Sequence, residues 1–194
     1  MIITVSGNSG CGKSTFSKVL SENLKFKYID VDAIVAEMYQ DEVMQKTLFS
    51  NFGVEVVNNE GRVEKKLVGK YVFQKKSRMD KLNELTWGYI ENKLDSIIES
   101  FKNVVIDYKF IPITKYFAQS QCNILVKAKD EEKRLQKIIE RDGISKEYLI
   151  KRESNGVDYS KYNFDYIVEN DYSQDYFDEC QKVILKIKEE RLWV

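Results

Sequence analysis

The segment from Gly7 to Thr15 constrains the fold most, because it fits the pattern G-x-x-x-x-G-K-[ST] and follows the apolar run Ile2–Val5. This pattern requires a strand before it and a helix after it. In such a turn, successive backbone N–H groups point into one concavity that can hold phosphate oxygens. The sequence therefore predicts a phosphate-binding loop, in preference to a glycine-rich turn before an ordinary helix.

The residues of this loop have distinct expected roles. Lys13 supplies a positive charge to the β- and γ-phosphates of ATP, and the Ser14 hydroxyl can take one place around a Mg²⁺ ion. Glycines are needed where a Cβ would block the approach of a phosphate. The loop residues that we expect to bind the nucleotide are Gly7, Gly10, Cys11, Gly12, Lys13, Ser14 and Thr15.

Beyond the loop, strands and helices alternate as in an α/β fold. Apolar runs predict further strands at 27–30, 103–107, 123–128 and 164–168. Helical spacing, with caps at Asp130 and Ser145, predicts helices at about 14–24, 33–39, 42–52, 64–73, 78–101, 130–141, 145–154 and 174–191. Continuous apolar strands are typical of parallel sheets covered on both faces. We expect a P-loop NTPase fold, a five-stranded parallel sheet flanked by helices.

The same pattern predicts one domain, residues 1–194, with three parts. Its core comprises 1–34, 102–128 and 160–194, and a helical lobe for the acceptor substrate comprises about 35–101. A helical lid covers about 129–158, and the residues at 58–61 form a turn between two helices.

Composition favours an enzyme that acts on a small molecule. Lys+Arg and Asp+Glu both number 31, so net charge gives no argument for nucleic acid or a membrane as partner. The longest apolar runs are shorter than a bilayer span and no apolar leader opens the chain, so we expect a cytoplasmic protein. Histidine is absent, which excludes every histidine-dependent mechanism. Phosphoryl transfer suits this restriction, because a single Asp can accept the hydroxyl proton.

The three cysteines, an odd number, indicate a reducing compartment. Cys122 begins an apolar run and should be buried. Cys11 should be a tolerated spacer in the loop, where N–H donors would stabilise its thiolate and leave it open to alkylation.

Three carboxylates fall at predicted strand ends, where ligands bind in open parallel sheets. If the second strand continues, Asp30 and Asp32 point the same way and one can accept the acceptor's proton. The alternative for Asp32 is a helix cap. Asp107 can act on Mg²⁺ through water, or it can be a solvated strand end.

The segment 129–143 is dense in charge, and most of it should be a solvated helix face. Three arginines, Arg134, Arg141 and Arg152, nevertheless occupy the predicted lid. A guanidinium brought down by lid closure can bind two phosphates and offset charge in the transition state.

Motifs spread over most of the chain resemble those of dephospho-coenzyme A kinases, which phosphorylate the ribose 3′-hydroxyl of dephospho-CoA. Ile29–Val35 resembles that family's D-x-D-x-[IL]-[AV] segment, and Asp165–Asn170 resembles its D-x-[VI]-[IL]-x-N segment. The other matching segments are Gly7–Thr15, Phe52–Gly53, Gly61–Val63, Val72–Phe73, Leu82–Asn83 and Glu140–Ser145.

The resemblance implies roles for four residues. Lys13 would bind the phosphates of ATP, and Asp32 would accept the proton of the 3′-hydroxyl. Arg141 would be the lid arginine, and Asn170 with its neighbours would lie near the adenine.

Three segments depart from the family. They are Thr86–Gly88 in place of a His-Pro pair, Tyr108–Pro112 in place of a Pro-Leu-Leu-[FY]-Glu stretch, and Arg152–Asn155 in place of a segment with glutamine. Because these changes fall on the acceptor side, two alternatives stay open. One is a nucleoside or nucleoside monophosphate kinase of the same fold, and the other is an inactive nucleotide-binding module.

Overall fold

The computed structural model describes residues 1–154 and 156–191 and contains a five-stranded sheet in the order β2-β3-β1-β4-β5. Every pair of neighbouring strands is parallel. The strands are β1 Ile2–Ser6, β2 Lys27–Asp30, β3 Val104–Asp107, β4 Cys122–Ala128 and β5 Tyr166–Asn170. The predicted parallel sheet is thereby confirmed.

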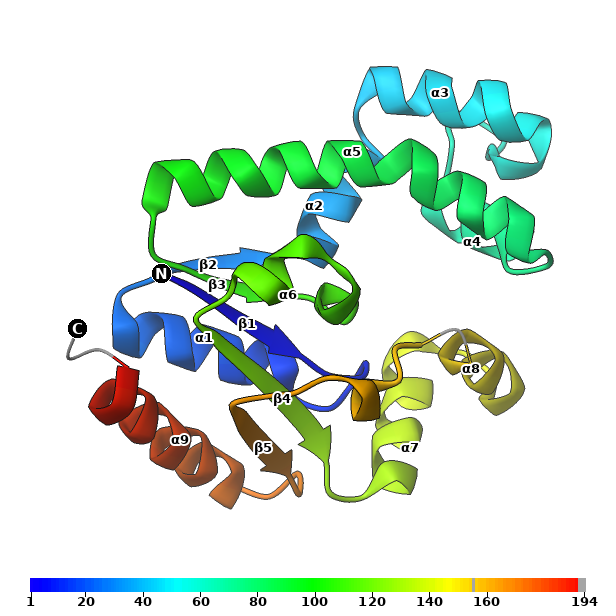
Figure 1. Cartoon of the computed structure of the whole chain (residues 1–194). Coiled ribbons are helices and arrows are strands. Elements are labelled where there is room, and N and C mark those ends of the chain that lie inside the picture. The colour runs from blue at the N-terminus through cyan, green and yellow to red at the C-terminus, as the bar shows by residue number, and fades with distance from the viewer. Residues whose placement is uncertain (155, 192–194) are drawn as a thin grey trace. The chain divides into compact units, whose positions relative to one another are not determined.

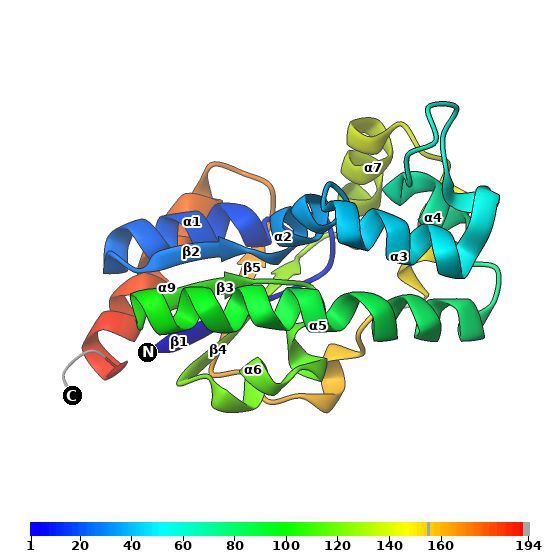
Figure 2. The same cartoon turned by 90° about the horizontal axis from the view of Figure 1, so that it is seen from above.

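The chain divides into two compact units, one of Met1–Asp30 with the chain from Phe101 onward and one of Val31–Ser100. The first unit holds the sheet and the helices α1 Lys13–Leu24, α6 Lys115–Gln119, α7 Glu131–Asp142, α8 Lys146–Glu153 and α9 Asp175–Arg191. Short 3₁₀ turns lie at Ile111–Ile113 and Tyr159–Lys161. Within this unit, α1 and α9 lie on one face of the sheet and α6 on the other (Figures 1 and 2).

Alternation along the strands explains why helices pack against the sheet. Side chains two residues apart, such as Ile3 and Val5 of β1, join the same core cluster, since successive residues of a strand face opposite sides. Phe16 and Leu20 of α1 reach this cluster at helical spacing. The other members are Cys11 of the loop and residues of β3, β4, β5 and α9, namely Val105, Cys122, Ile124, Val126, Val168, Tyr176, Cys180, Val183, Ile184 and Ile187.

The second unit is helical and has its own core. Its helices are α2 Val31–Met38, α3 Glu42–Phe52, α4 Lys65–Val72 and α5 Lys76–Phe101, whose last residue belongs to the first unit. A 3₁₀ turn follows α3 at Gly53–Val56. Fully buried residues such as Leu48 and Val68 form the centre of this core. The predicted turn at 58–61 is present, since the Gly61 amide donates to the Asn58 carbonyl at 3.0 Å.

Polar caps set the ends of the helices as predicted. The Asp130 side chain accepts from the Lys133 amide at the start of α7, and the Ser145 side chain accepts from the Tyr148 amide at the start of α8. These bonds satisfy amides that have no partner within their helices. Gly143, at φ 61°, ends α7.

Three elements differ most from the sequence-based expectations. Helix α2 begins at Val31 and not at residue 33. The fifth strand covers Tyr166–Asn170 and not 164–168, because Phe164 packs its ring against Phe117 instead, at 5.4 Å between centroids. Helix α6 was not predicted, since five residues are too few to show helical periodicity. Among the described residues, no helix is both long enough and apolar enough to span a bilayer.

Candidate functional site

The segment between β1 and α1 turns at glycines that no other residue could replace. Gly7 and Gly12 have φ angles of 151° and 92°. A Cβ on Gly7 would lie 2.4 Å from the Val126 carbonyl oxygen, and a Cβ on Gly12 would lie 2.4 Å from Nδ2 of Asn170. The loop therefore needs both the conformational freedom and the small size of glycine at these positions.

Four successive carbonyls of this loop each accept a hydrogen bond from a side chain outside it. The four donor side chains are Arg134 to Ser9 (2.6 Å), Tyr172 to Gly10 (3.0 Å), Asn170 to Cys11 (3.0 Å) and Tyr176 to Gly12 (3.0 Å). Within a peptide unit, C=O and N–H point in opposite directions. Holding the carbonyls outward therefore turns the amides toward the other side of the loop, where they favour an anion.

Lys13 is the first residue of α1, and its ammonium forms a buried ion pair with Asp107 at the end of β3. The Asp107 side chain is only 1% exposed. Its second oxygen accepts a hydrogen bond from the Tyr28 hydroxyl at 3.1 Å. Burial raises the pKa of Tyr28, with the Asp107 carboxylate adding to the effect, so Tyr28 stays a donor. The alternative of a solvated strand end at Asp107 is therefore wrong.

The sheet register brings carboxylates together beside the loop. Asp107 pairs with Val5 of β1 on one side and with Asp30 of β2 on the other. Because all three strands are parallel, their carboxyl ends lie at one edge of the sheet, where β1 leads into the phosphate loop. Ser14, next to Lys13, is exposed. In the described part of the chain, no group of three or more acidic or cysteine residues is arranged to hold a metal ion.

Asp32 does not lie on an extended segment. The strand ends at Asp30 and α2 begins at Val31, so the expected same-side alternation of Asp30 and Asp32 is wrong. Asp32 is not a cap either, since it lies inside the first turn of α2. A carboxylate there is favoured by the helix dipole. The role of Asp32 as proton acceptor stays a prediction.

The charged helix α7 has one buried arginine. Arg134 is 1% exposed and contacts Ser9, Glu131 and Glu153, so it is an exception to the solvated face that was expected for most of the segment. Burial acts to lower the pKa of Arg134, but the hydrogen bonds that it donates to Glu131 and Glu153 outweigh burial and raise the pKa.

Arg141 lies at the end of α7 with its side chain 61% exposed. Its Nε donates to Asp142 at 2.7 Å, and Arg152 of α8 donates to the same carboxylate at 3.3 Å. The hydrogen bond from Arg141 holds the pKa of Asp142 below its usual range. Both arginines thus share one carboxylate, and their contact with phosphates stays a prediction. Asn155 is the last residue of the segment 152–155 that differs from the family pattern, and it lies outside the described residues.

Cys11 is buried, and the expectation of a reactive thiolate is wrong. Its side chain is 1% exposed, and burial raises its pKa to about 11 although Lys13 acts to lower it. The expected burial of Cys122 is confirmed. Cys180 is also buried, and burial raises its pKa to about 11.

A thiol-specific reagent near neutral pH should therefore modify less than one thiol per folded chain, because the thiolate is the reactive form. In denaturant all three should react, and mass spectrometry of the digested protein would locate the label. Rapid labelling of Cys11 in the folded protein would contradict the burial described above.

Sequence reasoning missed Tyr28, Tyr172 and Tyr176. Their partners lie 79, 162 and 164 residues away, and no local pattern distinguishes such tyrosines from core aromatics. Asn170 was noticed through the resemblance alone. Its side chain donates to the Cys11 carbonyl and accepts from the Tyr172 amide at 2.7 Å, which places it against the loop. Its nearness to adenine stays a prediction.

A family model and a curated relative point to the same family. The family model for dephospho-CoA kinase matches residues 1–175. The dephospho-CoA kinase of Fusobacterium nucleatum is 32% identical over 148 residues, 76% of each chain. The solved dephospho-CoA kinase structure of Campylobacter jejuni has a TM-score of 0.65 and 25% identity over 97% of both chains. A Thermus thermophilus structure with a TM-score of 0.80 and 22% identity, over 96% of both chains, shows the fold.

Proposed function

The chain belongs to the dephospho-CoA kinase family, and on that premise we propose how its residues divide the work of the reaction. The protein is an ATP-dependent phosphotransferase that converts dephospho-CoA to CoA. The acceptor atom is the ribose 3′-hydroxyl. Catalysis of such a transfer depends mainly on positioning the reactants and on stabilising charge in the transition state. The observation that carries the assignment of roles is the loop with four outward-held carbonyls beside the Lys13–Asp107 pair.

Lys13 binds the β- and γ-phosphates of ATP. In the structure its ammonium forms an ion pair with the Asp107 carboxylate. A triphosphate carries more negative charge than that carboxylate and competes for the ammonium. The Lys13 ammonium therefore leaves Asp107 and pairs with the phosphates. Asp107 keeps the hydrogen bond from Tyr28, which holds the carboxylate in place.

The residues beside the loop fit a magnesium ion. The exposed Ser14 hydroxyl and the buried Asp107 carboxylate are hard oxygen donors, the type that Mg²⁺ prefers. Two protein groups suffice, because Mg²⁺ usually keeps several waters and phosphate oxygens as ligands. Ser14 would hold the ion directly and Asp107 through water. When bound, the ion supplies positive charge that offsets the charge of the phosphates.

The remaining roles rest on residues outside the loop. Asp32 accepts the proton of the 3′-hydroxyl as the phosphoryl group arrives, since a carboxylate can serve as base in a chain without histidine. Arg141, at the end of α7, leaves Asp142 and stabilises the transferring phosphoryl group. Asn170 and its neighbours lie near the adenine. The unit at 31–100 receives dephospho-CoA, and the segment 129–158 acts as the lid.

The expected setting is the cytoplasm. The three cysteines are free thiols, which suits a reducing compartment. The balance of 31 basic and 31 acidic residues favours a small-molecule substrate over nucleic acid or a membrane as partner.

The test is ADP release from MgATP with dephospho-CoA, nucleosides and nucleoside monophosphates offered as acceptors in parallel. We expect strong stimulation by dephospho-CoA with CoA as product. Stimulation by another acceptor alone would reassign the substrate to a nucleoside or nucleotide. Nucleotide binding without stimulation by any acceptor would indicate a binding module instead of an enzyme.

A further inference from the structure

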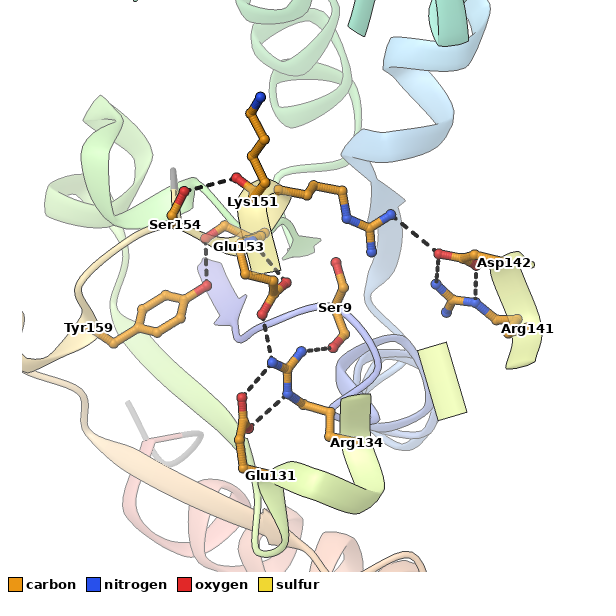
Figure 3. A network of polar contacts seen from close by, with 11 residues as sticks. Ser9, Glu131, Arg134, Arg141, Asp142, Lys151, Glu153, Ser154 and Tyr159 are labelled. Carbon is orange, nitrogen blue, oxygen red and sulfur yellow. Dashed lines mark hydrogen bonds and ion pairs between the residues drawn. The ribbon is translucent and has the colours of Figure 1, made fainter. Parts of the chain in front are cut away.

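Arg134 is bound on every side of its guanidinium (Figure 3). Nε and Nη2 donate to the two carboxylate oxygens of Glu131, one turn earlier on α7, at 2.8 and 2.5 Å. Nη2 also donates to Glu153 of α8 at 2.6 Å, and Nη1 donates to the Ser9 carbonyl at 2.6 Å. One side chain thus joins both predicted lid helices to the phosphate loop.

Glu153 extends this connection to the sheet. Its other oxygen lies 3.4 Å from the ammonium of Lys109, which follows β3 by two residues. Arg134 and Lys109 carry two positive charges, and Glu131 and Glu153 carry two negative charges, so the cluster is neutral. Because the guanidinium is already engaged by two carboxylates and a carbonyl, it is poorly suited to binding phosphate directly.

We propose that Arg134 is a positioning residue of the phosphate loop, which holds the Ser9 carbonyl outward and makes the loop's shape depend on α8 through Glu153. This inference rests on the proposed function of the loop as the ATP site. The other three donors to the loop come from β5 and the start of α9 or the segment between them. Arg134 is the one donor of the four that comes from the lid, and so it couples ATP affinity to the lid helices.

The chemistry of the side chain explains why arginine occupies this position. Its planar fork directs five N–H donors along fixed directions, so it can bind Glu131 through two bonds and still reach Ser9 and Glu153. A lysine has one nitrogen and cannot reproduce this set of directions. Methionine fills a similar volume and removes all four bonds.

The primary experiment measures the affinity of ADP, with and without Mg²⁺, for Arg134→Met by calorimetry. A hydrogen bond from a charged donor contributes about 1.5–3 kcal/mol, so the dissociation constant should rise roughly 10- to 150-fold. Unchanged ADP affinity in Arg134→Met would overturn the inference. If the unaltered protein itself did not bind ADP, the proposed function would fail, and this inference with it.

A second variant separates positioning from charge balance. Arg134→Met leaves Glu153, with 15% of its side chain exposed, beside Lys109 alone, so the melting temperature should fall. Adding Glu153→Gln returns the cluster to zero net charge, with Lys109 and Glu131 remaining, and should recover part of the melting temperature, whereas ADP affinity should stay low because Ser9 still lacks its donor. Recovery of affinity together with stability would show that Arg134 only balances charge. Lys182→Met, on α9 with 72% of the lysine side chain exposed, is the matched control and should change neither quantity.

Discussion

Asp32→Asn should lower kcat by about two to four orders of magnitude and leave the KM for ATP little changed, because an amide cannot accept the proton of the 3′-hydroxyl. The substitution keeps the size and most of the polarity of the side chain. It removes a charge from the first turn of α2, which should cost only about 0.3–1 kcal/mol of helix stability. Steady-state kinetics with dephospho-CoA, together with thermal unfolding, would measure both effects.

Two further substitutions make this test specific to Asp32. Asp80→Asn applies the same chemical change to an exposed position on α5 in the same unit, and it should leave kcat unaltered. Asp30→Asn tests the other carboxylate that the sequence left as a candidate, at the end of β2 beside Asp107. If Asp32→Asn retained the full kcat, its assignment as base would be wrong. A larger loss in Asp30→Asn would move the role to Asp30.

Lys13→Ala should lower kcat/KM for ATP by about two to three orders of magnitude, the loss seen when one preorganised charge-stabilising group is removed. Both kcat and KM should change, because the ammonium contacts phosphates in the ground state and in the transition state. Unaltered ATP kinetics would contradict the assignment of this segment as the phosphate loop.

The structure adds a second consequence to Lys13→Ala. The substitution leaves Asp107, with 1% of its side chain exposed, without its ammonium partner, and removing one member of a buried pair is strongly destabilising. The double variant Lys13→Ala with Asp107→Asn removes both charges and should melt at a higher temperature than Lys13→Ala alone. Its ATP kinetics should stay impaired. Recovery of activity in the double variant would mean that Lys13 serves stability and not phosphate binding.

Local sequence patterns predicted most of the fold correctly. The apolar strands, the helices at 42–52 and 78–101 to within two residues at each end, and the caps at Asp130 and Ser145 all depend on neighbouring residues. The fifth strand was predicted two residues too early. Phe164 is apolar and was therefore assigned to the strand, but its ring packs against Phe117 instead. Helix α2 began two residues earlier than expected, which changed the geometry of Asp32 relative to Asp30.

The candidate site was predicted less completely. The pattern from Gly7 to Thr15 identifies the loop, because its glycines, lysine and hydroxyl are contiguous in the chain. The predicted reactivity of Cys11 was wrong. The sequence shows that the N–H donors of the loop lie near Cys11, but it does not show that the sulfur is buried. Burial depends on which distant side chains cover the sulfur, and it was the stronger effect on the thiol.

The sequence by itself determined that this chain has a phosphate loop between a strand and a helix, an alternating α/β order and no histidine for catalysis. Only the tertiary structure decided how the loop is held. The four side chains that donate to its carbonyls lie 125 to 164 residues away in the chain, and the ion pair of Lys13 joins residues 94 apart. Local patterns report the preferences of neighbouring residues, whereas hydrogen bonds between distant residues depend on the sheet, which places its strand ends side by side.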